Sequence, residues 1–419
     1  MSMGLYARWM FAWETALTTR DENRIERPLE WGFDHLADFG GTELAARVER
    51  GELTNFDAMV ELNQRIVADP HSFFDYVTPT DFRVEMRHPE LFPTNVRPET
   101  LEAEREWHRQ AEAGELRREP FLRFTSPVRT PYPENDLVNA RWYPEQGIRE
   151  QGSGIRKPKQ AIIVMPQWNA DAFSHNALCE IFQKFGVASL RLSKPYHDIR
   201  RPEELERSDY AVSANIGRTI AACRQAVADI RASIDWLASQ GYEQFGVLGT
   251  SLGSCYGFVA AAMDPRIRVC TFNHASTWFG DVVYTGQSTR HIRAALDHAG
   301  LTQDTTRELF TGISPMSYMT EFAAAKRRTL IIHATYDLTF LHEFSLDVLR
   351  NFDAHHVSYE HKELPCGHYV TGEFPYKYMD GWWMGSFVWR EFRKLAREAG
   401  ASGNLSEVES PDPQMASQR

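Results

Sequence analysis

The chain has 419 residues, of which 42% are hydrophobic, 12% aromatic and 25% charged. These values exclude a disordered or low-complexity protein, and a chain of this length buries enough surface to fold without disulfides or metal ions. The 57 acidic and 46 basic residues give a formal net charge of −11. An acidic balance of this kind argues against nucleic acid as a partner.

The cysteines and the N-terminal sequence favour a cytoplasmic protein. The five cysteines are an odd number, lie far apart and form no Cys-x-x-Cys pair. The N-terminal residues are aromatic but interrupted by Arg8 and Glu14, without a small-residue cleavage site, so we expect no signal peptide. The one long stretch without charges, 244–263, is broken by glycines, which favours strand, turn and helix over a membrane span.

Residues 1–120 are predicted to form a helical N-terminal extension. Trp9, Ala12, Trp13 and Leu17 recur on one helical face, and a second helical pattern covers 43–66. The segment 101–116 is a highly charged helix with few apolar positions. We interpret its charges as a solvated face rather than a binding surface.

Short apolar segments alternate with helical patterns from residue 121 onward. The predicted strands are 121–125, 137–143, 161–165, 188–192, 245–248, 269–273, 330–334 and 356–362. The predicted helices are 176–185, 215–240, 252–262 and 384–396. This alternation predicts an α/β fold with a mainly parallel central sheet and helices on both faces. The polar segment 401–419 is expected to be a disordered tail.

The sharpest motif is Gly249-Thr250-Ser251-Leu252-Gly253, which follows a predicted strand and precedes a predicted helix. A Gly-x-Ser-x-Gly in this setting forms a sharp turn that exposes the serine hydroxyl at the carboxyl edge of the sheet. The turn also places the backbone N–H of Leu252 at a helix N-terminus, where it can stabilise an oxyanion. We therefore predict Ser251 as a nucleophile.

A serine nucleophile needs a base and an orienting acid, and both follow in the chain order that this motif requires. Asp337 closes the apolar segment that starts at Leu330, and His368 lies in a glycine-containing loop after the next predicted strand. We predict that His368 removes the proton from Ser251 and that Asp337 fixes the imidazole tautomer.

Other residues compete for these roles. Asp347 is a rival acid, but its helical surroundings are typical of a solvated carboxylate. His333 lies within a strand, as core histidines do, and His274 precedes the acid in the chain. Cys366 lacks the helix N-terminus or strand–turn setting of a reactive thiol.

No metal site is predicted. His355, His356 and His361 lie close together in the chain, but alternation along the predicted strand divides them between its two faces. The sequence contains no His-Glu-x-x-His, P-loop or Gly-x-Gly-x-x-Gly motif.

A second oxyanion donor is expected in the loop Pro166–Asp171, which follows the strand 161–165. We predict the backbone N–H of Trp168, with Gln167 as the alternative. Asn169 and Asp171 are also ordinary turn formers.

Residues from about Phe121 to Ala396 resemble the α/β-hydrolase superfamily, with Ser251, Asp337 and His368 at its nucleophile, acid and histidine positions, and we place the catalytic domain at 121–400. The chain is similar to the dienelactone-hydrolase and acetyl-xylan-esterase-like branches. It also resembles the α/β-hydrolase domain-containing protein 18 group in 124–127, 188–190, Pro195-Tyr196 and Arg201-Pro202. The His-Gly usual after the early strand is replaced by Pro166-Gln167-Trp168. The resemblance implies an acyl-enzyme mechanism without a cofactor.

In that superfamily the region that corresponds to 276–322 often carries a lid, and packing under a surface insertion is the alternative here. The N-terminal 120 residues are either a second cap or a dimerisation surface, which makes a homodimer one option. We predict hydrolysis of a small-molecule carboxylic ester. The alternatives are a peptidase of the same fold and a non-catalytic binding protein that keeps the three groups.

Overall fold

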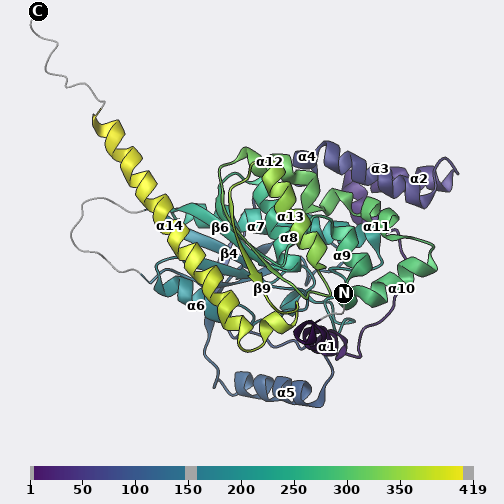
Figure 1. Cartoon of the computed structure of the whole chain (residues 1–419), viewed down its shortest axis with the longest axis horizontal. Helices are drawn as coiled ribbons and strands as arrows, with labels where there is room; N and C mark the ends of the chain where they lie inside the picture. The colour runs from purple at the N-terminus through teal and green to yellow at the C-terminus, as the bar shows by residue number, and fades with distance from the viewer. Residues whose placement is uncertain (1–3, 147–157, 409–419) are drawn as a thin grey trace, which may run out of the picture.

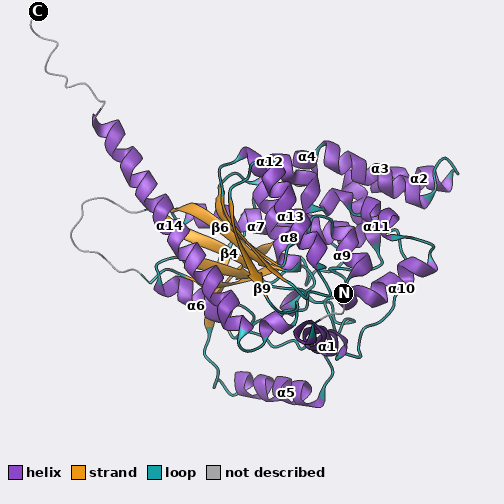
Figure 2. Ribbon diagram, viewed as in Figure 1, coloured by secondary structure: helices purple, strands orange, loops and turns teal. Residues whose placement is uncertain are grey.

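The computed structural model describes residues 4–146 and 158–408, and in these ranges a nine-stranded sheet forms the centre of the molecule (Figures 1 and 2). The strands are β1 (Arg83–Arg87), β2 (Glu119–Thr125), β3 (Leu137–Tyr143), β4 (Lys159–Met165), β5 (Ala188–Leu192), β6 (Tyr242–Thr250), β7 (Ile267–Asn273), β8 (Arg328–Ala334) and β9 (Tyr359–Leu364). Their order is β1-β2-β3-β5-β4-β6-β7-β8-β9. Every strand predicted after residue 120 is present.

The sheet is parallel from β5 to β9, and antiparallel pairing joins β1, β2, β3 and β5. The parallel strands therefore end at one edge, where the loops after β4, β6, β7, β8 and β9 meet. β9 begins at Tyr359 rather than at His356, because His356 has a left-handed backbone with a φ of 55°.

The N-terminal extension contains one strand that the sequence did not predict. β1 pairs with β2, with Arg83 opposite Arg123 and Arg87 opposite Glu119. Its side chains are exposed or half-buried, so β1 has no buried face that would give an apolar alternation. The N-terminal extension is otherwise helical, as predicted.

Helices make up most of the remaining described chain. They are α1 (Leu5–Thr19), α2 (Gly41–Glu49), α3 (Asn55–Ala68), α4 (Pro70–Phe73), α5 (Pro98–Glu112), α6 (Asn176–Lys184), α7 (Ile216–Ser239), α8 (Leu252–Met263), α9 (Phe279–Thr285), α10 (Arg290–His298), α11 (Gln303–Leu309), α12 (Met319–Ala324), α13 (His342–Ala354) and α14 (Tyr376–Val408). Short 3₁₀ helices are η1 (Phe33–Phe39), η2 (Asp198–Arg200), η3 (Gln287–Thr289), η4 (Thr311–Ile313), η5 (Pro315–Tyr318) and η6 (Val370–Gly372).

The sheet is covered on both faces, as predicted. On one face a core of buried side chains includes Phe182 of α6, Phe392 of α14 and Met10 of α1. On the other face Ile230 of α7 and Val259 of α8 belong to a larger core. This larger core also takes in buried side chains of α2–α4 and of the segment 276–322.

The predicted lid segment 276–322 folds into α9–α12 with η3–η5, and α3 packs against it (Figure 1). Asn63 of α3 makes hydrogen bonds to this segment. Its Nδ2 donates to Leu309 O at 2.9 Å, and its Oδ1 accepts from the Gly312 N–H at 2.8 Å. These buried bonds join α3 to α11 and η4, and the role of the segment as a lid stays a prediction.

α5 and the C-terminal part of α14 lie away from the core (Figure 1). α5 has no buried side chain, in agreement with the predicted solvated helix. α14 continues to Val408, so residues 401–408 of the predicted disordered tail are helical, and 409–419 lie outside the described residues. The first proline of the segment 401–419 is Pro411, so no proline ring interrupts the helix before Val408. In the described residues no helix combines the length and the apolar character that a membrane span requires.

Candidate active site

Ser251 occupies the turn between β6 and α8. Its φ of 57° and ψ of −121° lie outside the ordinary regions for a residue with a side chain, so the surrounding structure has to hold this conformation. The Ser251 N–H donates to Asn273 O at 2.7 Å. A Cβ at Gly253 would lie 2.1 Å from Met165 O, so a glycine is required where α8 meets the end of β4.

The structure brings the predicted serine, histidine and aspartate into hydrogen-bonding contact. His368 Nε2 lies 3.1 Å from Ser251 Oγ, and His368 Nδ1 lies 2.8 Å from Asp337 Oδ2. The three residues follow β6, β8 and β9, whose carboxyl ends share one edge of the sheet. The arrangement can pass a proton from Ser251 to His368 while Asp337 holds the imidazole.

The Asp337 carboxylate is buried, and both of its oxygens accept hydrogen bonds. Its Oδ1 accepts the backbone N–H groups of Thr339 and Phe340, each at 2.7 Å. Burial acts to raise the pKa of Asp337, but the charge of His368 and the nearby imidazoles outweigh it and hold this pKa well below its usual range. Asp337 is therefore an anion at neutral pH.

A second imidazole approaches the same carboxylate. His274 follows β7, is buried, and places Nδ1 3.2 Å from Asp337 Oδ2. Its ring centroid lies 4.4 Å from that of His368. Burial and the charge of His368 lower the pKa of His274, so it is a neutral neighbour of the anion. His274 precedes the acid in the chain, which argues against it as the base. Its position directly after a parallel strand is the sequence feature that could have placed it at this edge of the sheet.

Glu14 of α1 reaches the histidine loop from the N-terminal extension. Its buried carboxylate accepts the N–H of Tyr369 at 3.0 Å and that of Val370 at 3.1 Å, immediately after His368. A Cβ at Gly367 would lie 2.2 Å from Glu14 Oε2, so this close approach depends on a glycine before the histidine. Glu14 thus fixes the backbone on which His368 stands.

The buried face of α1 differs from the predicted one. Met10, Glu14 and Thr18 are buried, whereas Trp9 is 53% exposed. The helix is present as predicted, but the predicted face with Trp9 and Trp13 does not form its main contact with the rest of the protein. Glu14 can be buried because its carboxylate accepts hydrogen bonds from two backbone N–H groups. The spacing of apolar residues in the sequence does not reveal such polar partners.

The charges of the site act on one another. Burial, followed by the charge of Asp337, raises the pKa of Glu14 to about 7. Burial acts to lower the pKa of His368, but the negative charges of Asp337 and Glu14 outweigh it and raise this pKa. Two carboxylates therefore favour the protonated imidazole, which is the state that forms when His368 accepts a proton.

The loop predicted to supply the second oxyanion donor is held firmly. The Asn169 N–H donates to His197 Nε2 at 3.2 Å, and the Ala170 N–H donates to Gln167 O. Lys194 Nζ, buried, donates to Gln167 O at 2.8 Å. His197 and Lys194 follow β5 and were not singled out from the sequence.

Asp347 and Cys366, the rival acid and the rival nucleophile, have partners outside the group formed by Ser251, His368 and Asp337. Asp347 pairs with Arg350 at 3.0 Å on α13. The Cys366 thiol is buried against Thr371, and burial raises its pKa to about 12, which disfavours the reactive thiolate.

Two groups of side chains place possible metal-ligand atoms within 4.8 Å of one another in the described residues. They are His274, Asp337 and His368, and His333, His342 and Glu363. In the first group His274 and His368 both contact Asp337, and His368 also contacts Ser251. In the second, His333 Nδ1 also lies 3.0 Å from His361 Nε2. The prediction of no metal site stays a prediction.

No family model matches the sequence, and a comparison with curated proteins finds no match. Solved structures with a similar fold include acetyl xylan esterase 1 from Thermoanaerobacterium sp. JW/SL YS485, at 12% identity and a TM-score of 0.49, over 80% of this chain and 94% of that chain. The acetyl xylan esterase from Paenibacillus sp. R4 gives 12% identity and a TM-score of 0.48 over the same shares.

A Pyrococcus horikoshii acylaminoacyl peptidase is similar at 10% identity and a TM-score of 0.44, over 67% of this chain. This chain spans 46% of the length of that peptidase. The strand order, the turn at Ser251 and the following acid and histidine loops define the architecture. The chain has the α/β-hydrolase fold.

The first prediction concerns the charge of Glu14. Glu14→Gln keeps an oxygen acceptor but removes the negative charge that helps to raise the pKa of His368, so this pKa should fall. NMR titration of the His368 ring protons measures it directly. Thr15→Ala, on the exposed side of α1, should leave the titration unchanged. An unaltered His368 pKa in Glu14→Gln would show that the two groups are not coupled.

The second prediction concerns Gly367. Gly367→Ala places a methyl group against the Glu14 carboxylate, so we expect a loss of about 1–3 kcal/mol in the free energy of unfolding. Chemical denaturation measures the change. Gly372→Ala, where a Cβ meets no neighbouring atom, is the matched control in the same region. Equal stability of the two variants contradicts the close contact.

Proposed function

We propose that this protein is a serine hydrolase that cleaves a carboxylic ester through an acyl-enzyme on Ser251. The observation that carries the proposal is the contact from Ser251 Oγ through His368 to the buried Asp337, built on a strained turn. A structural serine has no need of this conformation, whose cost of roughly 1–3 kcal/mol is characteristic of functional positions.

In the first half of the reaction His368 Nε2 takes the proton of Ser251 as Oγ bonds to the ester carbonyl carbon. Asp337, already ionised, holds the Nδ1 proton and stabilises the imidazolium. His368 then gives the proton to the departing alcohol oxygen, and the acyl group stays on Ser251. In the second half His368 takes a proton from water as the water oxygen bonds to the acyl carbon. His368 then returns the proton to Ser251 Oγ as the bond between Oγ and the acyl carbon breaks and the carboxylic acid leaves.

The tetrahedral intermediate carries a negative oxygen that needs donors. We assign one to the Leu252 N–H in the first turn of α8, where backbone donors have no partner within the helix. We assign the second donor to the backbone N–H of Trp168. In the described contacts, the N–H groups of Asn169 and Ala170 are already donated elsewhere, and Gly253 packs on the carbonyls of Met165 and Pro166. The start of α8 and the loop before Trp168 therefore lie together.

The roles proposed here need only side chains, backbone donors and water. His274 lies beside His368 and contacts the same oxygen of Asp337, and Glu14 positions the loop that carries His368. Both are positioning residues, because the atoms they touch belong to the acid or to the histidine loop and not to the reacting serine.

The test is labelling with a fluorophosphonate, followed by intact-mass analysis. Wild-type protein should gain a single adduct, and Ser251→Ala should gain none. Ester turnover in Ser251→Ala should fall by a factor on the order of 10⁶, as in other serine hydrolases. Cys366→Ala is the matched control and should label like the wild type, because its thiol is buried and protonated.

Labelling of Ser251→Ala would place the reactive group elsewhere. Absence of an adduct on folded wild-type protein would favour a ligand-binding role without chemistry. Comparison of matched p-nitrophenyl esters and anilides separates an esterase from a peptidase, since an esterase should turn over the esters far faster.

A further inference from the structure

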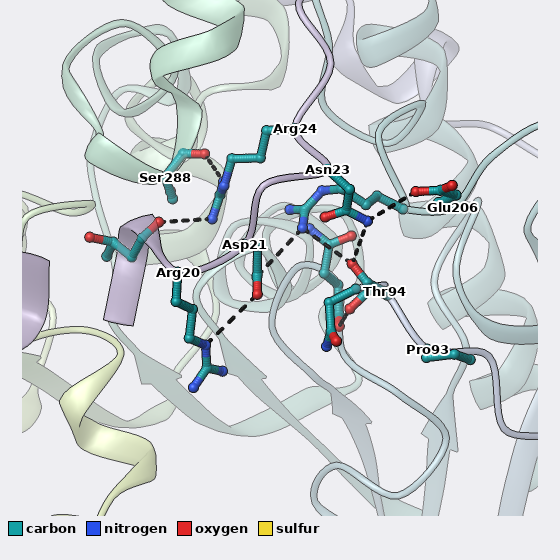
Figure 3. Close-up of polar contacts among 12 residues, drawn as sticks. Arg20, Asp21, Asn23, Arg24, Pro93, Thr94, Glu206 and Ser288 are labelled. Atoms are coloured by element: carbon teal, nitrogen blue, oxygen red, sulfur yellow. Dashed lines mark hydrogen bonds and ion pairs between the residues drawn. The ribbon is translucent and has the colours of Figure 1, made fainter. Parts of the chain in front are cut away.

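Three arginines gather beside the residues that flank the proposed active site. Arg24 lies in the segment after α1, Arg207 lies between η2 and α7, and Arg290 begins α10. We call them the arginine cluster. Figure 3 shows the contact of Arg24 with Ser288 and that of Arg20 with Asp21. Segments far apart in the sequence therefore contribute cations to one region.

Arg24 and Arg290 are held by neutral groups. Arg24 donates to Ser288 O and, at 3.2 Å, to Thr18 O. Arg290 donates to Thr18 O and to Gln287 O, both at 3.3 Å. In the part of the chain that the structure describes, neither guanidinium forms an ion pair with a carboxylate. Their positive charges are oriented but not neutralised.

Arg207 has two acidic neighbours. Its side chain is 2% exposed and lies 3.3 Å from Asp209 and 3.7 Å from Asp21. Asp21 is also shared with Arg20, at 3.9 Å. The two carboxylates thus pair with Arg20 and Arg207, whereas Arg24 and Arg290 have no carboxylate partner among the described residues, which leaves this group of side chains with a net positive charge.

The cluster also leaves polar atoms without partners. Arg24 Nε, Gln287 Oε1 and His291 Nδ1 are buried and have no hydrogen-bond partner among the described residues. Burial, followed by the charges of the three arginines, lowers the pKa of His291 to about 3. His291 is therefore a neutral imidazole in a positive field. Unsatisfied buried polar atoms of this kind are costly, and of the three Arg24 Nε is the donor that an anionic ligand could satisfy.

The position of the cluster links it to the reaction. The His291 ring is stacked against the Trp168 ring, with 6.1 Å between the two ring centroids. The Arg207 guanidinium carbon lies 5.7 Å from the centroid of the same Trp168 ring. Tyr369, whose ring lies 5.7 Å from that of His368, is close enough to influence the pKa values of both Arg207 and Arg290. Arg207 and His291 therefore lie beside the loop of the proposed oxyanion donor, and Arg207 and Arg290 lie near the tyrosine that follows the proposed base.

We propose that the arginine cluster binds an anionic group of the substrate, a carboxylate or a phosphate, so that the enzyme selects esters that carry a negative charge near the scissile bond. This inference rests on the proposed function. Guanidinium groups suit both anions, because their N–H donors match two oxygens of either group.

Arg200 and Arg201, two further arginines that follow β5, do not fill this role. Arg200 is fully buried in an ion pair with Asp229 at 2.8 Å. Arg201 donates to Pro93 O at 3.0 Å. Arg200 is already neutralised, and neither residue makes a described contact with Trp168 or Tyr369.

The kinetic test compares two pairs of esters. One pair is p-nitrophenyl butyrate and its anionic counterpart, mono-p-nitrophenyl succinate, and the other is butyryl glycerol and butyryl glycerol phosphate. Wild-type protein should prefer the anionic member of at least one pair, and the pair that shows the preference identifies carboxylate or phosphate. The preference should weaken as salt is added.

Arg24→Gln and Arg290→Gln should each reduce that preference by a factor on the order of ten, mainly through KM, with little change for the neutral ester. Arg293→Gln is the matched control, because it removes the same charge from α10 where Arg293 pairs with Asp297. A merely structural role for Arg24 and Arg290 at the end of α1 would lower the turnover of neutral and anionic esters alike, and would overturn the proposal.

A binding measurement keeps the proposal testable if no ester is turned over. Inorganic phosphate or succinate, against chloride at equal ionic strength, should raise the Tm of wild type and of Arg293→Gln. Neither anion should stabilise Arg24→Gln or Arg290→Gln to the same extent. Equal stabilisation of all four proteins would refute the anion site. Failure of fluorophosphonate labelling alone would refute only the proposed function.

Discussion

The buried negative charge of Asp337 is the constraint around which the proposed site is arranged. A carboxylate out of contact with water is costly unless every oxygen has partners, and here two backbone N–H groups and two imidazoles provide them. These partners come from the ends of β7, β8 and β9, so the parallel sheet has to bring three loops to one edge. The same charge orients His368 toward Ser251.

The N-terminal extension is part of this arrangement rather than a separate appendage. α1 delivers Glu14 to the backbone beyond His368, and Thr18 at the end of the same helix accepts hydrogen bonds from Arg24 and Arg290. One helix thus supports both the histidine loop and the arginine cluster. Displacement of α1 would alter the proposed base and the proposed anion site together.

The sequence predicted the features that depend on neighbouring residues. The turn at Ser251, the strands that carry it and the chain order of acid and histidine follow from local pattern, and the structure brings Ser251, Asp337 and His368 together. His274 and Glu14 could not be predicted, because each is defined by a partner far away in the chain. β1 lacks a buried face, and the aromatic residues of α1 suggested a different contact surface. The role of Trp168 rests on a loop whose sequence departs from the superfamily pattern.

The account rests most heavily on acyl transfer to Ser251. Rapid acid quenching during turnover of p-nitrophenyl acetate, followed by peptide mass spectrometry, measures this step directly. We expect an acetyl group on the peptide that contains Ser251, a stoichiometric burst of p-nitrophenol, and neither signal in Ser251→Ala. Turnover without an acetylated Ser251 peptide, or acetylation confined to another residue, would contradict the proposed mechanism.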